Sequence, residues 1–383
     1  MANVLVEQMQ DKLLTLNQVR ERLETTEPLQ TTHLSSENKI QFLFDQSWAT
    51  SLDTLHGDEN VAATIVVDGT EHQMSKDAAL QAAAAFGIPG AYMKKVPTTL
   101  LEPQLNYWYN GGIGSREFKM VRTGADGHVS AFIKPTIVPF SNRLLLDNAL
   151  LAITERYGSS GVLADYKFSH SLQQTDIRLI IPERDRTITN SGTENDLWSA
   201  GVHLSNSLVG SKQTSVDAYL FRWWCTNGAT AQMPNVGTWS RRRDGQTDDV
   251  YDWARESVDE VLGGMESAFD RVQSLTRLEL NNGKLNEVLS NIFVEYKVPK
   301  SQRGDIIEEL IGADNLNMYT LQQAITRQAN DPTISPDRAD KLMRIGGDIT
   351  TSVFNNIKAE VWREGHTADP DQPNPYEIVP TEV

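Results

Sequence analysis

The sequence predicts an α+β protein: a mostly antiparallel sheet domain with flanking helices, then an all-helical C-terminal region and a disordered acidic tail. Three observations lead to this fold class. Residues 64–74 read as two strands joined by Asp68-Gly69, a dipeptide that favours a tight hairpin turn. Residues 215–222 alternate apolar and polar side chains, as a half-buried strand does. From residue 248 onward apolar residues recur at helical spacing.

Composition and periodicity divide the chain into regions. We predict an N-terminal helix and docked arm over residues 1–60, an α+β core domain over 61–247, a helical region over 248–365 and an acidic tail over 366–383. Before and within the core domain, helices are expected over residues 3–24, 75–85, 100–109 and 142–153. Further strands are expected over residues 118–132, 166–172, 177–181 and 198–205.

Helix boundaries are signalled by capping residues. Ser75 is a favourable N-cap for the helix after the hairpin, and Gly87 followed by Pro89 ends it. In the C-terminal region we expect helices over residues 253–275, 285–296, 303–311, 318–329 and 335–364. Pro336 is suited to the first turn of the last helix, and Gly346-Gly347 is where that helix would break.

The stretch over residues 215–228 is the most unusual in the chain, since it combines two adjacent tryptophans, the only cysteine and an Asn-Gly turn. As a strand it places Tyr219, Phe221 and Trp223 on one face, and Arg222 with Trp224 on the other. Two interpretations remain open. Both tryptophans lie in the core, or Arg222 and Trp224 contact a ligand, because a guanidinium beside an indole suits a planar anion.

Charge and composition narrow the function classes. The net charge of −16 argues against a generally basic nucleic-acid binder, although the middle of the chain is mildly basic between acidic ends. Neither an apolar run long enough to span a membrane nor a signal-peptide pattern is present, which predicts a protein of the host cytoplasm. A single cysteine, Cys225, excludes an internal disulfide.

Catalytic patterns are weak, and an enzyme is not expected. The sequence has no HExxH, GxSxG or nucleotide-binding loop, so we predict no catalytic residue, metal or cofactor. There is one exception: His170 and His203 on neighbouring strands, with Asp176 nearby, would form a metal or acid–base site. A surface or satisfied core histidine is the commoner outcome for such a residue.

Basic and aromatic residues of the middle region favour single-stranded nucleic acid, which is held by positive charge along its backbone and rings under its bases. The predicted contact residues are Lys94, Lys95, Arg116, Lys119, Arg122, Lys134, Arg222, Trp224, Arg241, Arg242 and Arg243, with Tyr107 and Trp108 as further aromatic candidates. We therefore expect a non-enzymatic, oligomeric protein that binds single-stranded DNA in replication or recombination. The alternative is a protein-interaction role through the acidic helical C-terminal region, as an inhibitor of a host factor or a virion component.

Several short motifs resemble the phage/plasmid-like proteins of the family described as domain of unknown function 932. They lie at residues 84–93, 105–108, 120–122, 205–210, 221–228 and 319–326, and the resemblance as a whole covers roughly residues 60–350. Lys134-Pro135-Thr136 departs from the Ser-Asp-Arg-Tyr-like segment expected there. The resemblance implies a bacteriophage or mobile-element origin and no established reaction. A further likeness to single-strand annealing proteins is an analogy of fold.

Overall fold

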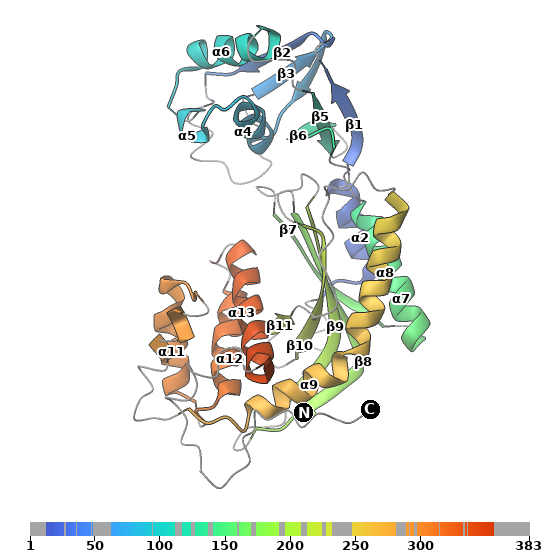
Figure 1. Cartoon of the computed structure of the whole chain (residues 1–383), viewed down its shortest axis with the longest axis vertical. Helices are drawn as coiled ribbons and strands as arrows, with labels where there is room; N and C mark the ends of the chain where they lie inside the picture. The colour runs from blue at the N-terminus through green and yellow to red at the C-terminus, as the bar shows by residue number, and fades with distance from the viewer. Residues whose placement is uncertain are drawn as a thin grey trace.

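The computed structural model of the protein describes residues 13–26, 28–35, 37–46, 48, 63–93, 95–111, 117–123, 127–136, 141–158, 161–169, 174–190, 196–207, 213–223, 227–231, 247–280, 289–290, 292–294, 297–313, 315–331, 334 and 336–355. Figure 1 shows them in a small unit, which contains β1 to β6, and a large unit built around a long sheet. The chain begins the large unit with α2 (Leu16–Thr26), crosses into the small unit and returns with α7 (Asn142–Tyr157). The small unit is therefore an insertion between two helices of the large one.

Within the described residues, two three-stranded antiparallel sheets, ordered β1-β5-β6 and β2-β3-β4, form the small unit together with three helices. Its elements are β1 (Pro28–Leu34), β2 (Ile40–Phe44), β3 (Ala63–Val67), β4 (Thr70–Gln73), α4 (Lys76–Ala85), α5 (Gly90–Met93), α6 (Thr98–Gly111), β5 (Phe118–Thr123) and β6 (His128–Ile133). The predicted hairpin is confirmed, because Asp68 and Gly69 take the positive φ angles of 49° and 86° that its two-residue turn requires. The predicted arm also contributes two strands, β1 and β2, which pair with β5 and β3.

Ser75 begins α4 and links the two small sheets. Its Oγ accepts a hydrogen bond from the Ala78 amide at 3.1 Å, as the predicted N-cap should. Its own amide donates to the Val129 carbonyl of β6 at 2.8 Å, and the adjacent Met74 forms an isolated bridge with Val129. The sheets and α4 therefore share one apolar core, to which α6 contributes Leu101 and Leu105.

The large unit is organised by a five-stranded sheet of order β11-β10-β9-β8-β7 in which every neighbouring pair is antiparallel. Its strands are β7 (Leu163–Ser169), β8 (Gln174–Ile188), β9 (Asp196–Ser207), β10 (Ser215–Arg222) and β11 (Asn227–Ala231). The register sets His203 of β9 between Arg178 of β8 and Asp217 of β10. Because side chains alternate along a strand, these three residues share one face.

The two faces of this sheet differ in chemistry and in the helices that cover them. One face presents buried aliphatic side chains such as Leu179, Val202 and Ala218. In Figure 1 α7 and α8 (Thr247–Gly263) lie on one side of the sheet, and α12 (Met318–Arg327) and α13 (Pro336–Asn355) on the other. The second face, toward α13, carries the polar side chains described below. Covering both faces explains why Trp198 and Phe221, which lie on opposite faces of the sheet, are each only 1% exposed.

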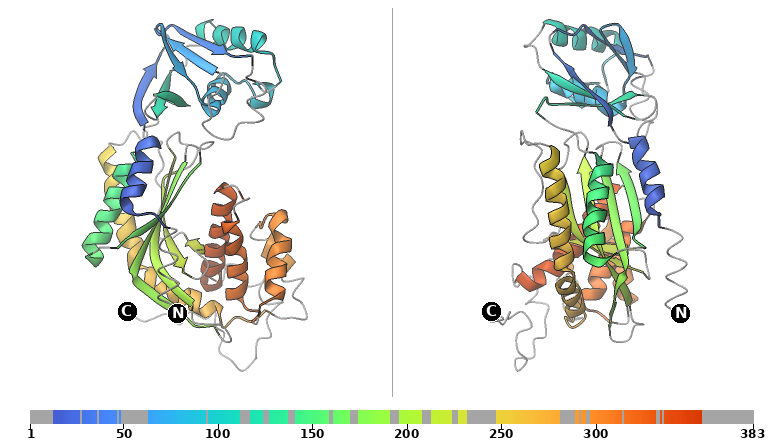
Figure 2. Two further views of the ribbon diagram at one scale, coloured as in Figure 1. Left: turned by 180° about the vertical axis from the view of Figure 1, so that it is seen from behind. Right: turned by 90° about the vertical axis from the view of Figure 1, so that its right-hand side faces the viewer.

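The N-terminal helix α2 belongs to the large unit. Val19 and Leu23 are fully buried in the same hydrophobic cluster as the central sheet. Leu14, which precedes the helix, exchanges backbone hydrogen bonds of 2.8 and 3.0 Å with Ala164 of β7. α2 also contacts α7, whose return from the small unit completes this side of the sheet (Figure 2).

The C-terminal helices follow the expected order with two corrections. The single long helix predicted over residues 253–275 is two helices, α8 and α9 (Met265–Leu275), which meet at Gly264. Glycine has a poor helix propensity, so the Gly263-Gly264 pair is a suitable place for the chain to change direction. α11 (Arg303–Ile311) and α12 are present as predicted, whereas α13 continues through Gly346-Gly347 without a break. Most of the helix predicted over residues 285–296 lies outside the described residues.

The predicted fold class is confirmed, since the structure combines antiparallel sheets with flanking helices and a helical C-terminal region. Buried apolar residues form two large clusters, one in each unit, with a minor third on β5 and β6. These hydrophobic clusters group residues by packing, whereas the four predicted regions were defined by composition and periodicity. The predicted domain boundaries therefore stay a prediction. The predicted acidic tail lies outside the described residues. Within those residues, no helix has the length and apolarity needed to cross a membrane.

Candidate functional site

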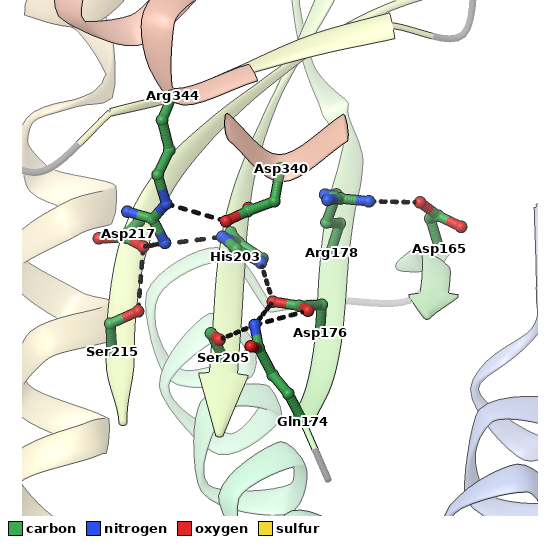
Figure 3. Close-up of polar contacts among 10 residues, drawn as sticks. All are labelled: Asp165, Gln174, Asp176, Arg178, His203, Ser205, Ser215, Asp217, Asp340 and Arg344. Atoms are coloured by element: carbon green, nitrogen blue, oxygen red, sulfur yellow. Dashed lines mark hydrogen bonds and ion pairs between the residues drawn. The ribbon is translucent and has the colours of Figure 1, made fainter. Parts of the chain in front are cut away.

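A buried polar cluster occupies the face of the large sheet that α13 covers (Figure 3). It brings together side chains from β7, β8, β9, β10 and α13: Asp165, Gln174, Asp176, Arg178, His203, Ser205, Ser215, Asp217, Asp340 and Arg344. A sheet face covered by a helix is normally apolar, and buried ionisable groups are rare unless they are paired or functional. The cluster is therefore a candidate site.

His203 lies at the centre of the cluster and is fully buried. One ring nitrogen, Nε2, is 2.9 Å from Oδ1 of Asp176, and the other, Nδ1, is 3.6 Å from Oδ2 of Asp217. Burial favours the neutral ring, but the hydrogen bond with Asp176 and the nearby Asp217 carboxylate outweigh it and raise the pKa of His203. The sequence placed His203 beside Asp176 correctly, whereas its other predicted neighbour, His170, lies outside the described residues.

Asp176 is 7% exposed and is held by its neighbours on β8 and β9. Gln174 Nε2 donates to both of its carboxylate oxygens, at 3.0 and 2.8 Å, and also to Ser205 Oγ at 3.0 Å. Burial by itself would raise the pKa of Asp176. The hydrogen bond from His203 and the charges of His203 and Arg178 more than offset it, so the pKa lies below its usual range.

Arg178 supplies a fully buried positive charge beside this carboxylate. Its guanidinium forms an ion pair with Asp165 at 2.9 Å and lies over the ring of Tyr219, 5.9 Å from the ring centroid. Burial opposes the charged form, but Asp165 and the other nearby acidic groups raise the pKa of Arg178 above its ordinary value.

Helix α13 closes the cluster with two residues one turn apart. Arg344 donates from Nε to Asp340 at 3.1 Å and from a terminal nitrogen to Asp217 at 3.1 Å. Asp217 is held from the other side by Ser215 Oγ, also at 3.1 Å. Several buried atoms of the cluster find no hydrogen-bond partner among the described residues: Gln174 Oε1, Arg178 Nε, His203 Nδ1 and Asp340 Oδ1.

A second candidate site is an open aromatic groove of about 630 Å³ on the small unit. It is lined by Gly87, Ile88, Pro89, Tyr92, Pro103, Gln104, Tyr107 and Trp108. Tyr92 is 39% exposed and Tyr107 65% exposed, and the ring of Tyr107 meets that of Trp108 edge to face at 5.6 Å. Exposed rings beside prolines form a flat apolar surface, on which a planar ligand can stack.

Comparison with known protein families matches residues 156–349, about half of the chain, to the family described as Domain of unknown function (DUF932). The chain belongs to the DUF932 family. Neither a curated protein nor a solved structure matches it. The matched range is narrower than the resemblance suggested, because the motifs at residues 84–93, 105–108 and 120–122 precede it. In this DUF932 protein the matched range contains every residue of the polar cluster, whereas the aromatic groove lies outside it.

The predicted contact residue Arg222 is engaged inside this DUF932 protein. Its side chain is 14% exposed, pairs with Asp196 at 2.7 Å and donates to Gln323 of α12 at 3.0 Å. Tyr319 of α12 donates to the same Asp196 carboxylate at 2.6 Å and accepts from Trp198 Nε1 at 3.1 Å. Arg222 therefore fastens α12 to the sheet, and we do not retain it among the proposed nucleic-acid contacts.

The Tyr319→Phe variant tests this fastening. We expect it to lower the free energy of unfolding by about 1–3 kcal/mol, since two buried polar partners lose a hydrogen bond. Chemical denaturation of the two proteins measures the difference. Tyr107→Phe is the matched control, because that ring is 65% exposed, and we expect it to change stability by less than about 0.5 kcal/mol. Equal stabilities for Tyr319→Phe and the unmodified protein would contradict the role.

The other predicted contact residues are distributed over the small unit. Lys95 is exposed at the end of α5, next to the aromatic groove, since its amide donates to the Tyr92 carbonyl at 3.0 Å. Lys119 and Arg122 lie on β5 and Lys134 follows β6; these strands lie across α4 from α5 (Figures 1 and 2). Among the described residues of this set, Lys95 therefore lies beside the groove through its backbone, although it does not line the groove, and the other three lie elsewhere. Lys94, Arg116, Trp224, Arg241, Arg242 and Arg243 lie outside the described residues.

Sequence reasoning missed most of the polar cluster. Asp217 stands out in the sequence only as part of a strand, and nothing there singles out the helix residues Asp340 and Arg344. The available signal was a set of ionisable residues at alternate positions of adjacent strands, such as Asp176 and Arg178. It does not reveal that α13, more than a hundred residues further along, closes over them.

Proposed function

We propose that the protein binds single-stranded DNA, with bases stacked in the aromatic groove of the small unit. The observation that carries the proposal is the exposure of Tyr92 and Tyr107 around one open groove. Base stacking on aromatic rings accepts any sequence, because every base has a flat face. Lys95 at the rim supplies a positive charge for the phosphate backbone.

The geometry of the groove favours a flexible strand over a duplex. Tyr92 is anchored by a hydrogen bond from its hydroxyl to Gln104 at 3.0 Å, which fixes one ring without covering it. Rings in a groove can reach bases only when these are unpaired and turned outward, whereas paired bases stack on each other. A role in replication or recombination of a phage or other mobile element, with an oligomer as the active form, belongs to the same proposal.

The test is a fluorescence-anisotropy titration of a labelled single-stranded oligonucleotide at two salt concentrations. Tyr107→Ala is expected to weaken binding about 5- to 150-fold, since stacking on one ring contributes about 1–3 kcal/mol per base. Lys95→Ala should lower affinity for all sequences alike and reduce the salt slope by about 1.

Leu100→Ala is the control, because this residue is exposed on the same helix, at 57%, but does not line the groove. Unchanged affinity for Tyr107→Ala, or no binding by the unmodified protein, would overturn the proposal. A protein-interaction role through the acidic C-terminal helices is the other proposal. Retention of a stoichiometric protein partner without DNA would favour it.

A further inference from the structure

The polar cluster contains a set of groups with the arrangement of a metal site. Asp176, His203 and Asp340 come from β8, β9 and α13, and each offers one ligand atom, with these atoms all within 4.8 Å of one another. All three residues are more than nine-tenths buried. We propose that Asp176, His203 and Asp340 bind a divalent transition-metal ion.

The surroundings of His203 match those of a metal-bound histidine. Metal-ligating histidines commonly bind through one ring nitrogen and donate the proton on the other to a carboxylate, which fixes the tautomer. Here Nε2 lies toward Asp176, and Nδ1 faces Oδ2 of Asp217 at 3.6 Å. Asp217 is itself held by Ser215 and Arg344 (Figure 3). A cation that replaces the proton between Asp176 and Nε2 would leave Nδ1–H to point at Asp217.

The two proposed carboxylate ligands, Asp176 and Asp340, also accept hydrogen bonds that hold them in place. Gln174 donates to both oxygens of Asp176, and Arg344 donates to Oδ2 of Asp340. Oδ1 of Asp340 has no hydrogen-bond partner among the described residues, although the residue is only 6% exposed. A buried carboxylate oxygen without a hydrogen-bond partner costs free energy. This oxygen therefore supports a bound cation independently of the spacing of the three ligand atoms.

Charge and ligand type identify the class of ion. Four carboxylates, those of Asp165, Asp176, Asp217 and Asp340, lie near three cationic groups, those of Lys167, Arg178 and Arg344. With His203 neutral, the carboxylates outnumber the cationic groups by one, and this excess of negative charge favours a bound cation. One imidazole with two carboxylates suits Zn²⁺, Mn²⁺ or Fe²⁺ better than Ca²⁺, which takes oxygen ligands alone. Three protein ligands leave coordination positions for water or a substrate oxygen.

The experiment uses the full-length protein, stripped with a chelator and titrated calorimetrically with MnCl₂ or ZnCl₂. We expect one ion per chain and a rise in the unfolding temperature with metal concentration. Asp340→Asn keeps the side-chain shape but removes the charged ligand, and Asp217→Asn weakens the support of His203. Each is expected to reduce metal affinity by about 10- to 100-fold or more.

Asp147→Asn is the matched control, since Asp147 pairs with Arg20 on the surface, and its metal affinity should equal that of the unmodified protein. The proposal is overturned if the unmodified protein binds neither metal at millimolar concentrations. The positive charge among the carboxylates would then come from a protonated His203 and not from a metal ion. The proposal is equally overturned if Asp340→Asn folds and binds as tightly as the unmodified protein. Should that variant fail to fold, the titration of the unmodified protein still decides.

Discussion

The Gly201→Ala variant is expected to unfold with a free energy lower by about 3 kcal/mol, or not to fold at all. Gly201 lies in β9, the central strand of the large sheet. A Cβ atom there would collide with the backbone carbonyl oxygen of Leu179 and come within 3.2 Å of both the ring and the carbonyl of Tyr219. These atoms belong to the two flanking strands, so relief requires the sheet itself to move. Urea denaturation monitored by circular dichroism measures the loss.

Gly304→Ala is the control for this substitution. Gly304 lies in α11, where an added Cβ would meet nothing within 4 Å. Alanine is the better helix former by about 0.8–1 kcal/mol, so this variant should be slightly more stable than the unmodified protein. A Gly201→Ala protein as stable as Gly304→Ala would show that the sheet relaxes around position 201.

The Arg178→Met variant is expected to lose about 3–5 kcal/mol of stability, because removing one member of a buried ion pair leaves its partners uncompensated. Arg178 is 1% exposed and lies near Asp165, Asp176 and Asp340. Methionine fills a similar length of side chain without the charge. Thermal and urea unfolding of the two proteins gives the difference.

The matched control for Arg178→Met is Arg20→Met. Arg20 pairs with Asp147 at 2.8 Å, but both side chains are more than a third exposed. Exposed pairs contribute about 0–1 kcal/mol, so this variant should be nearly as stable as the unmodified protein. If Arg178→Met loses no more than Arg20→Met, the cluster relaxes or admits water, and the buried charge is not essential to the fold.

Local signals in the sequence predicted the local structure well. Asp68-Gly69 and Ser75 are predictive because a positive φ angle and an N-cap depend on residues only a few positions apart. The helix break predicted at Gly346-Gly347 was wrong, because Ile345 and Ile349 are buried in the core and keep α13 continuous across the two glycines. Glycine propensity is a weak effect that packing overrides.

The candidate sites could be predicted only in part, because they depend on contacts between residues far apart in the sequence. The alternation of residues placed His203 near Asp176, since adjacent strands can be paired from the sequence. The same alternation placed Arg222 on a ligand-facing side. It could not show that α12 delivers Gln323 to that guanidinium from a hundred residues away. Tyr107 and Trp108 were among the predicted aromatic contacts, but the other wall of the groove, from Gly87 to Tyr92, belongs to the turn after α4 and to α5.

The insertion of the small unit between α2 and α7 has a practical consequence for work on fragments. The family match begins at residue 156, so a fragment that starts there would lack α2 and nearly all of α7. In the whole chain Val19, Leu23, Leu146 and Ile153 pack against the aliphatic residues of the large unit. Without these side chains that apolar surface would be exposed to water, and the fragment should aggregate. A soluble core fragment would instead retain both helices, with a short linker in place of the excised unit.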